Sequence, residues 1–89
     1  QMTAVVRRNL PRAQRCYEIA ANMMGRAPDL RLAITLRVSP AGSVTSVDID
    51  GSDFGGIHAC VRRSVMTWVF PPSSTGGQTT IPMVVAGSN

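Results

Sequence analysis

The stretch from residue 30 to residue 38 constrains the fold most, because apolar and polar or small side chains alternate along all of it. A period of two is typical of a β-strand with one buried face. Pro40 and Gly42 then supply a turn, since proline fixes φ and glycine accepts a positive φ. A second alternating run follows over residues 44–49. Residues 30–50 are therefore predicted to form a β-hairpin.

Residues 3–24 are predicted to form an α-helix, because apolar side chains recur in steps of four and three. The residues of this stripe are Val6, Leu10, Ala13, Tyr17, Ala20 and Met24. Pro11 lies inside the pattern and lacks a backbone donor, so it is expected to bend the helix or to start a second segment. Gly25 is well placed to cap the C-terminal end.

A second helix is predicted over residues 55–69, with Ser52 or Asp53 as its cap and Pro71 preventing its continuation. Its apolar face is formed by Ile57, Val61, Ser64, Val65 and Trp68. After a flexible loop, alternation resumes and predicts a last strand over residues 79–86.

The predicted order is α-β-β-α-β, which places the chain in the α+β class. Two helices are expected to pack on one face of a three-stranded antiparallel sheet. A chain of 89 residues makes one domain, here residues 1–89. The chain begins with Gln1 and shows no signal-peptide pattern, so it is expected to be a fragment of a longer protein.

The two cysteines, Cys16 and Cys60, stand at the borders of the apolar faces of the two predicted helices. If both helices cover the same sheet face, the thiols could meet, and a disulfide would add about 4 kcal/mol of stability. Two reduced, buried cysteines are the alternative. From the residues alone both interpretations stay open.

No other group of residues indicates catalysis, a metal site or a cofactor. Asp48, Asp50 and Asp53 cluster after the second strand, but they lack the pattern of a calcium-binding loop and are expected to serve turns and caps. His58 is the only histidine, which makes a metal site improbable on ligand count. No nucleophile, base and stabiliser converge, so the chain is not expected to be an enzyme.

All basic residues are arginines, nine of them against five acidic residues, which gives a net charge of +4. Such a charge could favour nucleic acid, anionic lipid or an acidic partner, or it could simply form a solvated face. The predicted strands carry no aromatic residue for stacking bases, and no GXXG loop joins two helices. A basic nucleic-acid-binding domain is therefore kept as the alternative function.

The segments "WVFPP" (68–72) and "IPMVV" (81–85), with the hairpin turn, resemble the end of a TonB-like C-terminal domain. More closely, "RAQRCYEIA" (12–20) and "IHACVRRSVMTWVFP" (57–71) are similar to AgmX/PglI-type C-terminal domains of gliding-motility envelope proteins, which carry one cysteine at each of these places. The resemblance covers residues 5–86. The Tyr-Pro run typical of classical TonB domains is absent, so recognition of outer-membrane transporter peptides is not implied.

This resemblance implies a Cys16–Cys60 disulfide, since an oxidising periplasm permits one. It also implies a periplasmic domain of an inner-membrane-anchored, energy-coupling or gliding-motility protein that binds a periplasmic or outer-membrane protein. No small-molecule substrate is expected, and membrane contact is expected only through an N-terminal anchor outside this sequence.

The last strand is expected at a sheet edge beside the first strand, because a proline in a strand is tolerated there. If alternate residues bond inward, Pro82 and its neighbours two positions away face the open edge, where a partner strand could add. The candidate partner-binding residues are Thr79, Thr80, Ile81, Pro82, Met83, Val84 and Val85. Trp68 is expected in the core, and Phe70 is a possible partner contact.

Overall fold

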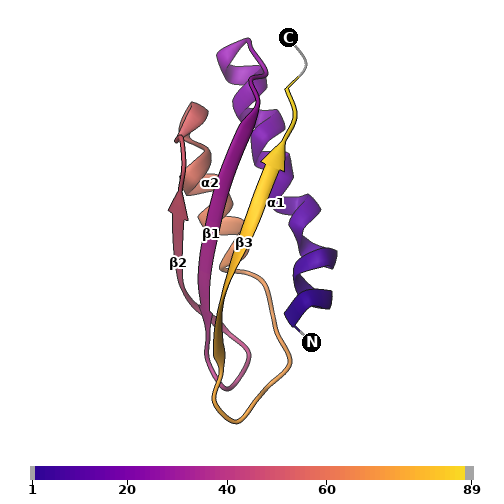
Figure 1. The fold of residues 1–89 in the computed structure, drawn as a ribbon, viewed down its shortest axis with the longest axis vertical. Helices are drawn as coiled ribbons and strands as arrows, with labels where there is room; N and C mark the ends of the chain where they lie inside the picture. Colours follow the sequence, from indigo (N-terminus) through magenta and orange to yellow (C-terminus); the bar gives the residue numbers. More distant parts are fainter. Residues whose placement is uncertain (1, 88–89) are drawn as a thin grey trace.

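The structure is a computed structural model that describes residues 2–87. Gln1, Ser88 and Asn89, the ends of the predicted 1–89 domain, lie outside the described residues. The elements are α1 (Met2–Met24), β1 (Leu30–Val38), β2 (Val44–Asp50), the 3-10 turn η1 (Phe54–Gly56), α2 (Ile57–Val65) and β3 (Gly77–Val85) (Figure 1). The three strands form one antiparallel sheet in the order β2-β1-β3. The predicted α-β-β-α-β order and α+β class are confirmed.

Pro11 was expected to bend the helix or to start a second segment; α1 continues through it, so no second segment starts there. Burial explains the continuity, because side chains are buried on both sides of the proline: Val5 is 4% exposed and Ala13 is fully buried, whereas Met24 of the predicted stripe is 48% exposed. Pro11 itself is exposed, so its ring requires no space in the core. The helix ends as predicted, with Gly25 at φ 70° and its N–H donating to Ala21 O at 2.9 Å.

The hairpin forms as predicted, with every second residue of β1 buried. Gly42 has a φ of 96°, and a Cβ there would collide with the carbonyl of Phe70. The turn is therefore locked to the segment after α2, and Phe70 N–H donates to Gly42 O at 2.9 Å. The expectation that Asp48 and Asp50 serve turns is corrected, because both lie within β2 on its exposed face.

Helix α2 is shorter than the predicted 55–69 segment. Gly55 and Gly56 have positive φ values of 61° and 77°, so the α conformation begins only at Ile57. The N-cap of α2 is Gly56 rather than the expected Ser52 or Asp53, but the Asp53 carboxylate accepts a hydrogen bond from His58 N–H in the first turn at 2.8 Å. The helix ends at Val65, and the chain turns into an extended segment.

That extended segment after α2 is held by the hairpin turn through Val69, which forms an isolated bridge with Ser43. This pairing with a residue far away in the sequence explains why α2 ends at Val65 rather than at the predicted residue 69.

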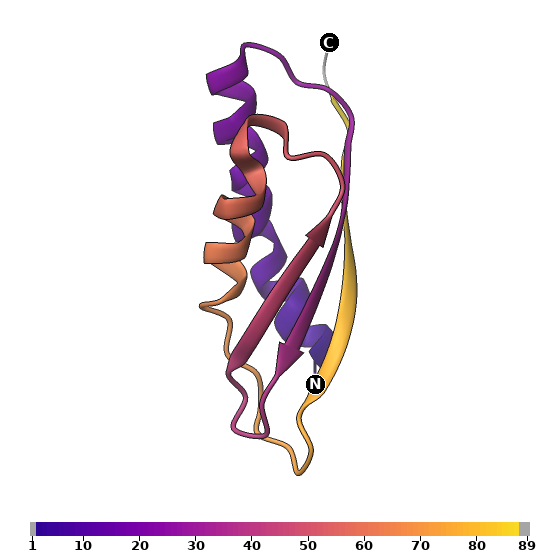
Figure 2. The ribbon, with the colours of Figure 1, turned by 90° about the vertical axis from the view of Figure 1, so that its left-hand side faces the viewer.

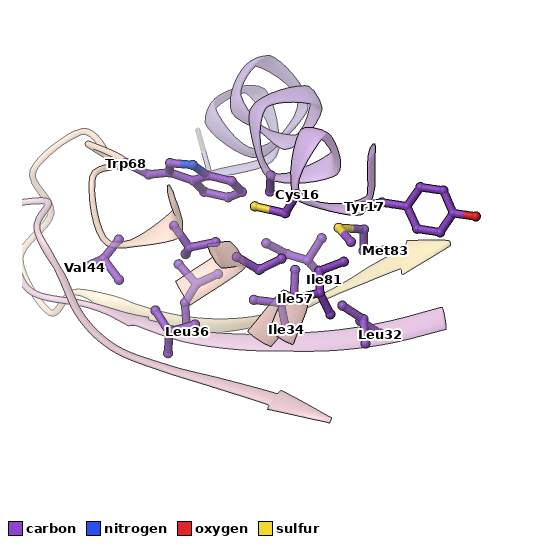
Figure 3. Packing of buried hydrophobic residues seen from close by; sticks show 14 of the residues in the cluster. Cys16, Tyr17, Leu32, Ile34, Leu36, Val44, Ile57, Trp68, Ile81 and Met83 are labelled. Carbon is purple, nitrogen blue, oxygen red and sulfur yellow. The ribbon is translucent and has the colours of Figure 1, made fainter. Parts of the chain in front are cut away.

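The two helices form one layer and the sheet forms the other (Figure 2). Side chains from both layers meet in a single core between them (Figure 3). The most deeply buried large side chains are Leu32, Ile34, Leu36, Ile57, Val61, Val65 and Met83. Trp68 is only 2% exposed and closes this core, as predicted. The opposite face of the sheet is not covered by any element of the described chain.

Candidate functional site

The outer edge of β3 is the candidate site. Strand β3 pairs only with β1 among the described residues, so its other side carries no strand. Its register is antiparallel and regular over the whole strand, with Pro82 opposite Ala33. The predicted position of the last strand, beside the first strand at a sheet edge, is confirmed.

The register indicates which backbone groups of β3 face outward. A proline has no N–H, so in an unbroken ladder Pro82 occupies a position whose backbone points away from β1. Backbone direction alternates along a strand. Thr80 and Val84 then also point their N–H and C=O groups toward the open edge.

The other side of the sheet agrees with this assignment. If the backbone of Ala33 does not bond to β3, it bonds to its β2 partner Asp50. By the same alternation, the backbone of Thr35 bonds to its β2 partner Asp48. Val47 has the opposite parity to Asp48 and Asp50, so its backbone N–H and C=O must point outward from β2. Its carbonyl does accept a hydrogen bond from outside the sheet, from Arg62 Nε at 3.4 Å.

A shallow hollow of about 220 Å³ runs beside the outer edge of β3, between that strand and the start of α1. Val6 is half-buried and packs against the core, and Leu10 lies one turn further along the same flank of α1. A strand added to β3 would lie next to this flank. The hollow is lined by Thr3, Val6, Thr79, Thr80, Ile81 and Pro82.

The predicted edge residues divide into two sets with different roles. Ile81 and Met83 are 6% and 0% exposed and belong to the core. Thr80, Pro82 and Val84 are exposed on the other face of the sheet. Thr80 also contacts β1 through a 2.9 Å hydrogen bond between its hydroxyl and that of Thr35.

Phe70 does not belong to the candidate site, which corrects the expectation that it contacts a partner. Its side chain is 2% exposed and lies in the core, whereas the neighbouring Val69 is 73% exposed. The reason is the shortened α2. Residues 68–70 are extended rather than helical, so Trp68 and Phe70 share the inner side and Val69 faces solvent.

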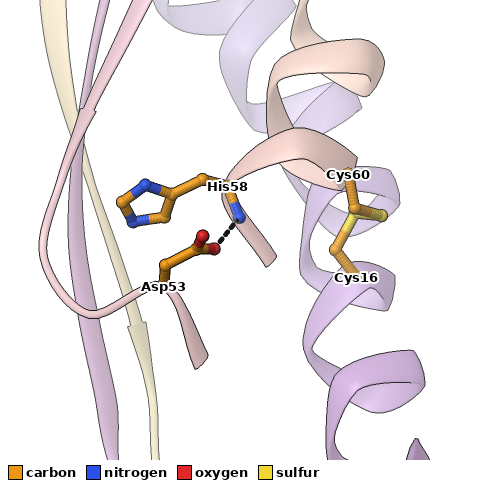
Figure 4. Close-up of a disulfide and its surroundings, with 4 residues drawn as sticks. All are labelled: Cys16, Asp53, His58 and Cys60. Atoms are coloured by element: carbon orange, nitrogen blue, oxygen red, sulfur yellow. Dashed lines mark hydrogen bonds between the residues drawn. A yellow bond between two sulfur atoms is a disulfide. The ribbon is translucent and has the colours of Figure 1, made fainter. Parts of the chain in front are cut away.

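The predicted disulfide is present: Cys16 and Cys60 are bonded, with their Cα atoms 5.8 Å apart (Figure 4). It joins α1 to α2 at the middle of the helix layer, with Cys16 buried and Cys60 half-buried. It thereby fixes α2 above the β2 side of the sheet. Neither cysteine of the chain is free.

Sequence reasoning missed the contact between α2 and the edge of β2. Arg62 bonds the outward carbonyl of Val47, and His58 lies one turn earlier on the same flank of α2. Figure 4 shows the His58 ring on the side of α2 away from the disulfide. The spacing of four places His58 and Arg62 on one flank of α2, but the sequence does not indicate that Arg62 contacts Val47 of β2.

The described residues contain no group of three or more His, Cys, Asp or Glu side chains placed to hold a metal ion. None of the helices over residues 2–87 combines the length and apolar character needed to cross a bilayer. Comparison of the chain with known protein families, curated proteins and solved structures finds no match. The fold and the open edge define a small, disulfide-bonded α+β domain, and the TonB-like resemblance stays a prediction.

Proposed function

We propose that this domain is a non-enzymatic interaction module that binds a partner protein by strand addition along the outer edge of β3. The observation that carries the proposal is the contrast between the β3 edge, with which no described strand pairs, and the β2 edge, where Arg62 bonds the carbonyl of Val47. Strand addition uses backbone hydrogen bonds for affinity and alternate side chains for specificity.

The hollow beside β3 specifies the kind of segment that fits. Alternate side chains of an added strand would face the helix layer, where Val6 and Ile81 line the hollow. Apolar side chains are favoured there because they remove further apolar surface from water. The other side chains would continue the solvent-facing surface that carries Thr80 and Val84.

The TonB-like resemblance supports the setting of this activity. The domain would lie in the periplasm as the C-terminal part of an inner-membrane-anchored energy-coupling or gliding-motility protein. Its partner would be a periplasmic or outer-membrane protein of an envelope-spanning machine. A disulfide between Cys16 and Cys60 suits an oxidising compartment such as the periplasm.

The test is an NMR titration of the isotopically labelled domain with extended peptides from candidate envelope partners. Perturbed amides should concentrate in residues 79–85. The variant Val84→Pro removes one outward N–H and should weaken binding about twofold to tenfold, the effect of one backbone hydrogen bond. Val84→Thr keeps the N–H and is the matched control. Perturbations that avoid residues 79–85 would exclude strand addition at β3.

A further inference from the structure

The charges of this domain are divided between its two layers. The helices carry six of the nine arginines and a single acidic residue, Glu18. The three strands carry two arginines and two aspartates, which cancel. The helix layer therefore accounts for the net positive charge. All six helix arginines are exposed, namely Arg7, Arg8, Arg12, Arg15, Arg62 and Arg63.

Three of these arginines share one outer stripe of α1 with exposed apolar residues. The stripe advances in helical steps of four, three, four and four, so its members lie on one face of α1. Its apolar members, Ile19 and Met23, are 55% and 73% exposed. The stripe consists of Arg8, Arg12, Arg15, Ile19 and Met23.

Helix α2 continues this surface. Arg63 is exposed one turn after Cys60, and Met66, directly after the helix, is 44% exposed. The disulfide to Cys16 joins the two helices at the level of Arg12 and Arg15, which lie within one turn of it. We call the stripe of α1 together with Arg63 and Met66 the outer helix face.

We propose that the outer helix face binds the surface of an anionic phospholipid bilayer. Guanidinium groups form bidentate hydrogen bonds with phosphate, and they gain energy near an anionic surface. Exposed Ile19 and Met23 on the same face would insert among the headgroups, as in interfacial amphipathic helices. This contact would act independently of any membrane anchor.

A bilayer fits this face better than single-stranded nucleic acid does. Binding of single strands relies on aromatic side chains that stack on bases. All four aromatic residues of the chain are buried, at 2–7% exposure, so none is presented to a base. The apolar side chains that the face does present are aliphatic or thioether groups, which suit acyl chains.

The charge test uses vesicles of phosphatidylcholine with or without phosphatidylglycerol, sedimented with the folded domain. Binding should require the anionic lipid. The double variant Arg12→Gln/Arg63→Gln should lower the partition coefficient about 25-fold, at roughly fivefold for each arginine. Arg31→Gln/Arg37→Gln makes the same change in net charge on the sheet and should have little effect. Equal losses for both pairs, or no binding to anionic vesicles, would overturn the proposal.

The apolar test uses two pairs matched in exposure. Ile19→Ser/Met23→Ser removes side chains that are 55% and 73% exposed, and Val84→Ser/Val69→Ser removes two with the same exposures away from the outer helix face. The first pair should lower partition about tenfold and the second hardly at all. Thermal melts of all four double variants would check that each one is folded. Unchanged partition for the first pair, or tighter binding to a DNA oligonucleotide than to anionic vesicles, would overturn a lipid partner.

Discussion

The two edges of the sheet differ in what covers them. On the β2 side, α2 lies close enough for Arg62 to bond the outward carbonyl of Val47. On the β3 side, the start of α1 leaves a hollow, and Pro82 alone modifies the edge. Natural proteins cover or blunt exposed edges because unpaired strands promote aggregation. Here a helix side chain bonds one outward carbonyl of the β2 edge, while the β3 edge is blunted only by Pro82, which suits a strand that pairs with a chosen partner.

The difference depends on the disulfide, which holds α2 to α1. The double variant Cys16→Ala/Cys60→Ala should therefore have the largest effect. A bridge between residues 44 apart contributes about 4 kcal/mol in the chain-entropy model. Urea unfolding should show a loss of this size in the free energy of unfolding, and reduced wild-type protein is the control. Amide exchange should rise at Val47 and its neighbours more than at β3. A uniform rise would show that the disulfide does not specifically hold α2 over β2.

Phe70 tests whether the partner surface is confined to the β3 edge. Phe70→Ala should lower the free energy of unfolding by about 3 kcal/mol, because it empties a buried site. Val69→Ala, at the exposed neighbouring position, should change it by less than about 0.5 kcal/mol. Peptide affinity should be unchanged in both folded variants. A loss of affinity in Phe70→Ala without a loss of stability would restore it as a partner contact.

The sequence predicted best those elements whose periodicity extends over many residues. The hairpin, the buried stripe of α1 and the edge position of the last strand all follow from local patterns and from Pro82. The end of α2 could not be predicted in this way. It depends on the bridge between Val69 and Ser43, a pairing remote in sequence.

The burial of Phe70 was not predicted for the same reason. Its side chain faces the core in an extended segment, whereas a continued helix would turn it toward solvent. The hydrogen bond from Arg62 to Val47 likewise depends on the tertiary position of α2, which the spacing of side chains along a helix does not contain.

Arg62 and Arg63 are adjacent in sequence, but only Arg62 contacts the β2 edge through a hydrogen bond, which makes them a matched pair. Arg62→Ala should lower the free energy of unfolding by about 0.5–1 kcal/mol, since the bond is long and the side chain exposed. Arg63→Ala, with the same charge change, should be near neutral. Amide exchange along β2 should increase only in Arg62→Ala. Equal effects from the two variants would mean that the charge, not the contact with Val47, protects this edge.

Pro82 gives the smallest change in stability and the most direct test of the open edge. Pro82→Thr should cost only about 0.5 kcal/mol, because it mainly restores freedom to the unfolded chain. It also adds an outward N–H to β3, so both peptide binding and self-association should strengthen. Val84→Thr changes the side chain on the same edge without adding a backbone N–H, and it should leave both unchanged. Analytical ultracentrifugation and the peptide titration would measure the two effects. If Pro82→Thr stays monomeric and binds peptides no better, the β3 edge does not accept strands, and the contrast between the two edges has no functional meaning.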